Sequence, residues 1–349
     1  MAVIPSSEVK NLFTKALVAI YKERIRPTSF LRSFFNVKET LSRFISIEVQ
    51  RGTEKVAVDV LRGSKGNRNE TSLATEKIIS PPYYREYFDL TALSVYDNVF
   101  GVDGNVSENA FALLLEAVRD KMNDLIDKIE RAYELQCSQV FETGIVTIAE
   151  GTNIDFKRKA ASLVDNTATP WTTGTNDPIL QLQNGAKFIR ETGKSTGANV
   201  NIILGSQAMN ALLRNDIFQK MSDVKNFGLG VVNMPQRNSV GASYHGRITL
   251  GSYTGDLWTY PQVYESPAGV VTPYIHEKKV IIVPEVTNFL LSFAGVPGLV
   301  NGKPTPLKGQ YHFGEYPDER NHNVDYDVRS AGVAVPLAID QIYTMQVIA

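Results

Sequence analysis

Cysteine is almost missing from this chain, because Cys137 is the single cysteine among 349 residues. One cysteine cannot close an intrachain disulfide and cannot build a cysteine metal cluster, so a disulfide-stapled fold and a zinc-finger fold are both excluded. A fold without such cross-links is typical of proteins that fold under reducing conditions. Cys137 falls inside a predicted helix, where a packed thiol is favoured over a nucleophile.

Long apolar runs are also absent. A membrane-spanning helix needs about 20 consecutive, mostly apolar residues, and no stretch of the sequence reaches that length. Near the N-terminus the apolar run 16–20 is short, and the apolar residues from Val9 to Ile20 recur at helical spacing. This pattern predicts an amphipathic helix that ends before Pro27 and not a signal peptide, and we expect no membrane partner.

A strong charge of one sign is lacking over the whole chain but not within its parts. The net charge of −1 gives no general electrostatic argument for a nucleic-acid partner. Residues 1–68 hold 13 Lys and Arg against 6 Asp and Glu, whereas residues 107–142 hold 4 basic against 8 acidic residues. A basic arm and an acidic segment in one chain favour contact between neighbouring copies, with solvated faces as the alternative.

Catalytic signatures are lacking as well. The segment Gly193–Thr196 ends like a P-loop, but Phe188 stands where the first glycine belongs, and a predicted helix precedes the segment. We therefore predict a helix C-cap at this place. There is no G-x-S-x-G nucleophile elbow, and the histidines are too far apart for the spacing of a zinc site. These histidines are His245, His276, His312 and His322. The sequence predicts no catalytic residue, no cofactor site and no metal site.

Two charged clusters could bind a ligand, but neither has the required pattern. The acidic cluster between residues 315 and 327 lacks the spacing of an EF-hand, so a solvated loop is predicted. It comprises Glu315, Asp318, Glu319, Asp325 and Asp327. The basic cluster Arg62, Lys65 and Arg68 could touch DNA phosphates, but no aromatic residues or recognition helix accompany it. Contact of these three side chains with a neighbouring subunit is favoured.

The strongest positive signal is one long amphipathic helix over residues 107–142. Apolar residues recur there at helical spacing, Ser107 is a suitable N-cap, and Gly144 ends the pattern. At 1.5 Å per residue, such a helix is about 50 Å long. Its acidic face is predicted to receive a Lys or Arg of a neighbouring subunit. That face consists of Asp120, Asp124, Asp127 and Glu134.

A projecting two-stranded ribbon is predicted before this helix, over residues 43–90. Residues 44–49 and 56–61 alternate between apolar and polar side chains, and the polar, glycine-bearing stretch 62–70 predicts a solvated tip. Pro81 and Pro82 cannot donate ladder hydrogen bonds, so the return limb is predicted to be an edge strand or irregular. Such a ribbon is marginally stable alone and needs a partner surface.

An α/β lobe is predicted after Pro170. A helix that starts at Asp177–Pro178 and stops at Gly193 is followed by a strand over 200–204 and a short helix over 206–213. A hairpin around Gly251 and a buried strand over 280–283 come next. This alternation of helices and strands is typical of an α/β arrangement.

This order of elements resembles the major capsid proteins of tailed bacteriophages with the HK97-type fold, and more narrowly the lambda-type family. Three segments carry the resemblance: Pro81–Tyr96, Tyr274–Pro284, and Ser330–Asp340 with Tyr343–Val347. The resemblance implies an α+β fold of five parts. They are an N-terminal arm (1–42), an E-loop (43–90), a P-domain (91–175) with the spine helix (107–142), an A-domain (176–310), and a C-terminal return to the P-domain (311–349).

The resemblance also implies the function. It indicates a structural protein, not an enzyme, that self-assembles into hexamers and pentamers of an icosahedral shell around double-stranded DNA. The shell would be assembled in the cytoplasm of a bacterial host and become part of the virion. Because only about forty residues precede the ribbon, we expect a separate scaffold protein, with portal and decoration proteins and non-specific contact to DNA. The alternatives are an encapsulin-like compartment and an α/β enzyme with its site in residues 176–283.

Overall fold

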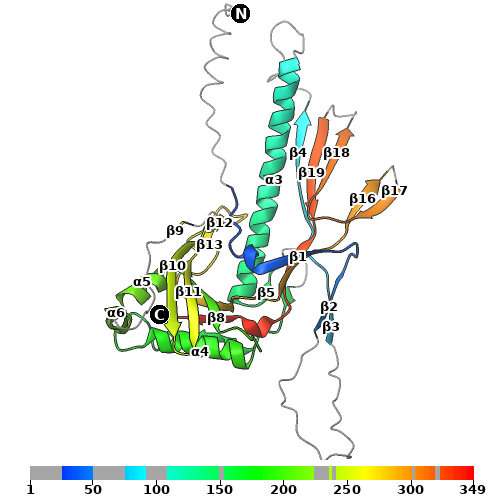
Figure 1. Cartoon of the computed structure of the whole chain (residues 1–349). Coiled ribbons are helices and arrows are strands. Elements are labelled where there is room, and N and C mark those ends of the chain that lie inside the picture. The colour runs from blue at the N-terminus through cyan, green and yellow to red at the C-terminus, as the bar shows by residue number, and fades with distance from the viewer. Residues whose placement is uncertain are drawn as a thin grey trace, which may run out of the picture.

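The computed structural model describes residues 26–49, 75–91, 108–148, 153–223, 236–237, 241–300, 303–318 and 323–349. A long helix rises from a compact α/β lobe, and strands run alongside the helix (Figure 1). The predicted amphipathic helix near the N-terminus, the ribbon tip and the N-cap Ser107 lie outside these residues. No described helix is long and apolar enough to cross a membrane.

The long helix α3 (Glu108–Glu142) has 35 residues and confirms the helix predicted from the apolar spacing. Leu125, Ile129, Tyr133 and Cys137 are buried at every fourth position, so one stripe of the helix faces the core. The helix ends where Gly144 adopts a φ of +76° and donates its N–H to the carbonyl of Val140. Glycine takes this left-handed conformation without steric cost, which explains the position of the end.

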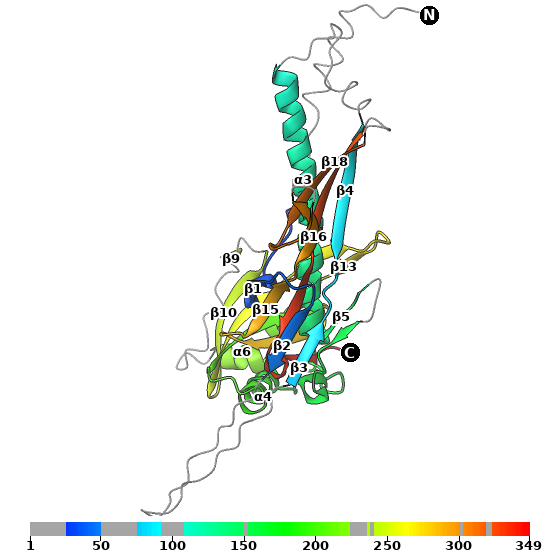
Figure 2. The ribbon, with the colours of Figure 1, turned by 90° about the vertical axis from the view of Figure 1, so that its right-hand side faces the viewer.

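Two three-stranded sheets pack against α3. The first has the order β18 (His312–Asp318), β19 (Asn323–Ser330) and β4 (Tyr84–Thr91), all antiparallel. The second has the order β1 (Phe35–Glu39), β15 (Phe289–Phe293) and β20 (Gly332–Pro336), in which β1 and β15 are parallel. The first sheet runs along the upper part of α3 (Figure 2).

The ribbon is shorter than predicted within the described residues. Strands β2 (Ile45–Val49) and β3 (Thr75–Ile79) pair antiparallel, with Ile45 opposite Ile79. The chain then leaves the ladder at Ser80–Tyr83, and β4 pairs with β19 in another sheet. The return limb therefore breaks at Pro81 and Pro82, because proline has no N–H to continue the ladder. The predicted ribbon over 43–90 ends at Ile79.

In its described residues, the lobe has a seven-stranded sheet flanked by three helices. The strand order is β7 (Leu163–Asp165), β21 (Tyr343–Gln346), β14 (Lys279–Pro284), β8 (Asn199–Leu204), β11 (Tyr253–Thr259), β10 (Ser243–Leu250) and β9 (Gln236–Arg237). The helices are α4 (Pro178–Glu191), α5 (Ser206–Arg214) and α6 (Asp216–Asp223). The helix, strands and hairpin predicted after Pro170 are thus present.

The P-loop-like segment is a helix end, as predicted. Asp177 caps the start of α4 by accepting the N–H groups of Ile179 and Leu180. At the other end, Gly193 donates to the carbonyl of Phe188, and Lys194 has a φ of +54°. This geometry closes a helix C-terminus and does not form a phosphate cradle that opens a helix.

Strands β8 and β14 are shared between two hydrophobic cores. Ile281 and Val283 of β14 belong to the core around α3, whereas Val280 and Ile282 belong to the core of the lobe. Alternate side chains of a strand point to opposite faces, so the sheet is covered on both sides at this place. This explains why β14 has consecutive apolar residues. A strand with one solvated face would instead alternate between apolar and polar residues.

The predicted A-domain (176–310) and C-terminal return (311–349) each contribute strands both to the sheets beside α3 and to the lobe. Strand β15 and the hairpin of β16 (Val296–Val300) and β17 (Lys303–Leu307) fall within the predicted A-domain, but β15 pairs with β1 and β20 beside α3. Strands β19 and β20 lie against α3. The last strand, β21, instead joins the lobe by pairing with β14 and β7.

Candidate assembly surfaces

The predicted basic tip, Arg62, Lys65 and Arg68, lies outside the described residues. The predicted acidic face is described, and its members lie in different environments. Asp120 is exposed and Asp124 is partly buried. Asp127 is only 8% exposed, and Glu134 is fully buried. The prediction was wrong for Glu134, because the helix passes from a solvated end into the core and its polar face is covered there.

Glu134 fastens the N-terminal segment to α3. Its Oε1 accepts the N–H of Leu31 at 2.8 Å, and its Oε2 accepts the N–H of Arg32 at 3.1 Å. These two N–H groups stand at the start of the 3-10 helix η1 (Arg32–Phe34), where no intrahelical acceptor is available. Glu134 therefore caps η1 from 103 positions further along the chain.

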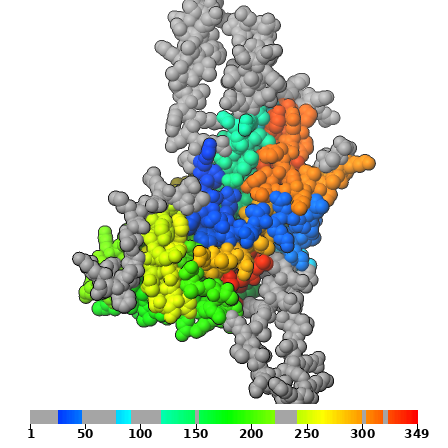
Figure 3. Space-filling model, viewed as in Figure 1, coloured from blue at the N-terminus to red at the C-terminus, as the bar shows by residue number. Residues whose placement is uncertain are grey.

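The same carboxylate reaches the lobe through Tyr260. The Tyr260 hydroxyl donates to Glu134 Oε1 at 2.7 Å and also contacts the hydroxyl of Thr28. Burial raises the pKa of Glu134, while the hydrogen bonds from Tyr260 and the backbone favour the charged form and oppose this shift. Three segments distant in sequence thus meet at one buried acid. Figure 3 shows the N-terminal segment (blue) between the strands of the lobe (yellow) and the sheet beside α3 (orange).

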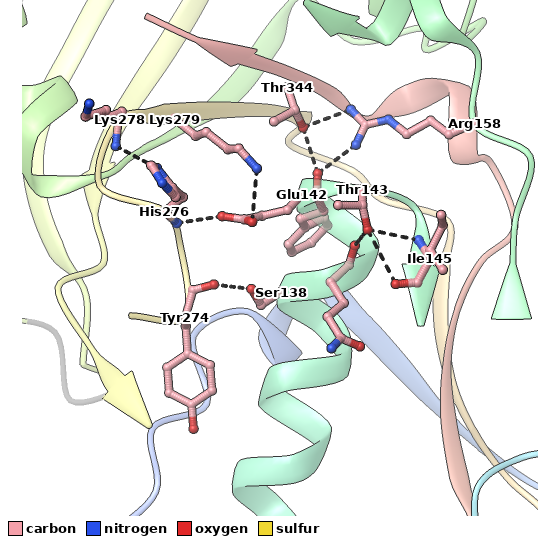
Figure 4. A network of polar contacts seen from close by, with 12 residues as sticks. Ser138, Glu142, Thr143, Ile145, Arg158, Tyr274, His276, Lys278, Lys279 and Thr344 are labelled. Carbon is pink, nitrogen blue, oxygen red and sulfur yellow. Dashed lines mark hydrogen bonds and ion pairs between the residues drawn. The ribbon is translucent and has the colours of Figure 1, made fainter. Parts of the chain in front are cut away.

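A second polar network joins the C-terminal end of α3 to the lobe (Figure 4). Glu142 accepts the N–H of His276 at 2.5 Å and the ammonium of Lys279 at 3.2 Å. Ser138 donates its hydroxyl to the carbonyl of Tyr274. Glu142 therefore binds the segment that leads into β14 and fixes it to the end of α3. Among the described residues, no three His, Cys, Asp or Glu side chains gather closely enough to hold a metal ion.

Arg158 closes the end of α3, and sequence reasoning missed it. Its guanidinium donates to the carbonyl of Phe141 at 2.7 Å, to the carbonyl of Ile342 at 3.0 Å and to the hydroxyl of Thr344 at 2.8 Å. Two more hydrogen bonds go to the hydroxyl and carbonyl of Ser162. Burial lowers the pKa of Arg158. The side chain joins the last turn of α3 to the C-terminal segment.

The described members of the acidic cluster predicted as a solvated loop lie instead on strands β18 and β19 of a sheet. Asp327 lies on β19 and is fully buried between two arginines. Arg85 Nε approaches its Oδ2 at 2.7 Å, and Arg329 Nε approaches its Oδ1 at 3.3 Å. Arg329 also donates to the carbonyl of Pro297, which ties the β16–β17 hairpin to the sheet. The Asp327 carboxylate therefore pairs with two arginines and stabilises the fold.

A groove of about 640 Å³ opens between the ribbon root and the β16–β17 hairpin. Its walls are mainly apolar, and Leu41 and Tyr83 are 54% and 48% exposed. Arg43 supplies a charge at the groove and stacks over the ring of Phe44 at 5.4 Å. Nothing in the sequence pattern indicated this groove, because its walls come from residues 41–43, 80–83, 294–298, 304–306 and 331, which meet only in the fold.

A spine helix flanked by sheets, a ribbon root and an α/β lobe define a shell-forming structural protein with the HK97-type capsid fold. The sequence model of the family described as phage major capsid protein E matches residues 13–347, and the chain belongs to this family. It is therefore a major capsid protein, a structural component of the multi-subunit shell of a phage virion. No curated protein matches the sequence.

Solved structures confirm the fold. The putative capsid protein of a prophage from E. coli CFT073 has a TM-score of 0.63 at 15% identity, with 100% of both chains covered. The capsid of the cyanophage P-SCSP1u has a TM-score of 0.53 at 10% identity and covers 99% of both chains. The mature capsid of bacteriophage PhiM1 has a TM-score of 0.51 at 10% identity, over 93% of this chain and 89% of that chain.

Proposed function

We propose that this capsid protein forms hexamers and pentamers of an icosahedral shell that encloses double-stranded DNA, assembled in the cytoplasm of a bacterial host. The observation that carries the proposal is the family match over residues 13–347. It favours a phage shell over an encapsulin-like compartment and over an enzyme with its site in residues 176–283. Separate scaffold, portal and decoration proteins would act with it, and DNA would be contacted without sequence preference.

The proposed contact between subunits uses opposite charges. The basic ribbon tip, Arg62, Lys65 and Arg68, would approach the end of a neighbour's acidic face at Asp120, which is exposed, and Asp124, which is partly buried. Asp120 is exposed, which supports access from outside. Exposed ion pairs are individually weak, but a shell repeats each of them many times.

Co-expression with a candidate scaffold protein, followed by negative-stain microscopy, tests the proposal. We expect closed shells of uniform diameter. Deletion of residues 63–70 should leave the circular dichroism spectrum of the subunit unchanged and reduce the yield of shells. A protein that remains a monodisperse monomer under all conditions, with and without scaffold, would contradict the proposed function. Particles from infected cells that hold protein cargo and no DNA would favour the encapsulin-like alternative.

A further inference from the structure

A short hairpin projects from the lobe beside α3 (Figure 2). It consists of β12 (Val263–Glu265) and β13 (Val271–Pro273), paired antiparallel. Its loop is closed by two backbone hydrogen bonds, from Ser266 to Val270 and from Gly269 to Ser266. Gly269 has a φ of +76°, which a turn of this kind requires of glycine. The hairpin therefore has a defined shape.

The tip of this hairpin is apolar and exposed. Val270 and Val271 near the tip are 59% and 64% exposed, and Pro267 and Ala268 in the loop are exposed as well, while Val263 at the root is 54% exposed. Such a cluster on a projecting element is typical of an interaction site. The root of the hairpin is anchored, because the ring of Tyr264 packs on that of Tyr274 with centroids 5.1 Å apart. The hairpin thus presents its apolar end from a fixed base.

The groove at the ribbon root has the complementary character. Its lining includes Leu41, Tyr83 and four prolines, Pro81, Pro297, Pro304 and Pro306. Prolines have no N–H to offer an added strand, so this surface suits inserted side chains better than strand addition. At about 30 Å³ of liquid volume per water, a groove of about 640 Å³ holds on the order of twenty waters, whose release would favour an apolar occupant.

The charges match as well. Glu265 is exposed beside the apolar tip, and Arg43 is exposed at the groove. Within the described part of the chain, neither side chain forms an ion pair. The β12–β13 hairpin lies on the opposite side of α3 from the ribbon root and the β16–β17 hairpin (Figure 1), which border the groove, so a tip cannot enter the groove of its own subunit.

We propose that the β12–β13 tip of one subunit inserts into the ribbon-root groove of a second copy, where Glu265 pairs with the second copy's Arg43. The inference rests on the proposed function, because it requires copies that assemble. Two different patches on one chain that fit each other make a head-to-tail contact, which closes rings or continues into larger assemblies. A second copy is the occupant that the matched apolar and charged surfaces of one chain favour.

Engineered disulfides test the contact directly. Cys137 is fully buried, so introduced cysteines can be read without interference from it. The double variant Val270→Cys with Leu41→Cys should give a ladder of covalent oligomers on a non-reducing gel after assembly. Each single variant should give no product beyond a dimer. A double variant that gives no ladder, in shells that form normally, would overturn the proposal.

Charge reversal provides a second test. Glu265→Arg or Arg43→Glu alone should lower the yield of shells about tenfold, which corresponds to 1.4 kcal/mol, and the two together should restore it. A charge at the apolar tip, Val271→Asp, should also lower the yield of shells. Val286→Asp is the matched control and should leave the yield unchanged, because Val286 is 79% exposed but lies outside the hairpin. Wild-type protein that forms no shells would count against the proposed function itself. Wild-type shells with unaffected single variants, or with no rescue, would overturn only this contact.

Discussion

A fully buried charge, Glu134, and a partly buried one, Arg158, join the N-terminal and C-terminal described segments to the spine helix at different places. Glu134 accepts three hydrogen bonds and joins the N-terminal described segment to the C-terminal third of α3. Arg158 donates five hydrogen bonds and fastens the C-terminal segment to the end of α3. Both charges are stabilised mainly by backbone and hydroxyl groups. Burial of a charge is tolerated when such partners are complete.

The two sites differ in how many backbone and hydroxyl groups would lose a hydrogen-bond partner if the charged side chain were replaced. The carbonyl of Phe141 has a second donor in the hydroxyl of Thr344, but the other acceptors around Arg158 depend more on the guanidinium. Around Glu134 the donors are two N–H groups and one hydroxyl. We therefore expect that the loss of Arg158 costs more free energy of unfolding than the loss of the charge on Glu134.

The largest effect is expected for Arg158→Met. The variant leaves buried carbonyls without their donor, and the free energy of unfolding should fall by about 3–5 kcal/mol, the usual cost of breaking a buried charged network. Urea denaturation followed by circular dichroism measures it. Arg158→Lys should recover only a part, since one ammonium cannot reach all five acceptors. A loss no larger than that of Lys187→Ala, an exposed surface change, would show that the network is dispensable.

A smaller effect is expected for Glu134→Gln. The amide group would turn a donor toward the N–H of Arg32, and one buried N–H would lose its acceptor, at a cost of about 1–3 kcal/mol. Glu130→Gln is the matched control, because Glu130 contacts the same Arg32 from a side chain that is 26% exposed. Equal losses of unfolding free energy in the two variants would contradict the expectation that the buried Glu134 contributes more than the partly exposed Glu130.

The pH dependence sharpens the comparison further. Because burial raises the pKa of Glu134, the folded protein binds this proton more tightly than the unfolded chain does. The resulting stabilisation is complete below the ordinary Glu pKa of about 4.3 and is lost as the pH rises through the folded pKa. The difference in free energy of unfolding, wild type minus Glu134→Gln, should therefore fall from pH 4 toward neutrality. Parallel curves would contradict a raised pKa.

The smallest effect on stability is expected at the exposed end of the acidic face. Asp120→Lys should change the free energy of unfolding by no more than about 0.5 kcal/mol, as is usual for exposed positions. If the neighbour's basic tip docks there, the yield of shells should fall nevertheless. Reversal of Arg62, Lys65 and Arg68 to Glu in the same chain should then restore assembly. An unchanged yield for Asp120→Lys would refute this docking site.

Local pattern predicted the elements well where one period dominates. Apolar residues at helical spacing predicted α3, and the cap Asp177 with Gly193 predicted both ends of α4. The same logic failed for Glu134, which shares its helical spacing with Asp120 but lies where other segments cover the helix. Burial there is set by Leu31 and Tyr260, which are distant in sequence.

The contacts between segments distant in sequence could not be predicted from the spacing of residues. The acceptors of Arg158 are spread from Phe141 to Thr344, and the groove at Arg43 has walls from two separate parts of the chain. The break of the ribbon at Pro81 was foreseeable, because proline lacks a ladder donor, but the new partner of β4 was not. Long-range pairing depends on the whole fold, whereas capping and periodicity are local.

The wall formed by β8 and β14 has a consequence for how the subunit melts. Each strand contributes alternate side chains to the two cores, so neither core can lose its packing while the other keeps a complete face. Two cores joined only by a linker would unfold independently. Because these two cores share strands β8 and β14, we expect them to unfold together. A calorimetric scan of the subunit should therefore show one cooperative transition.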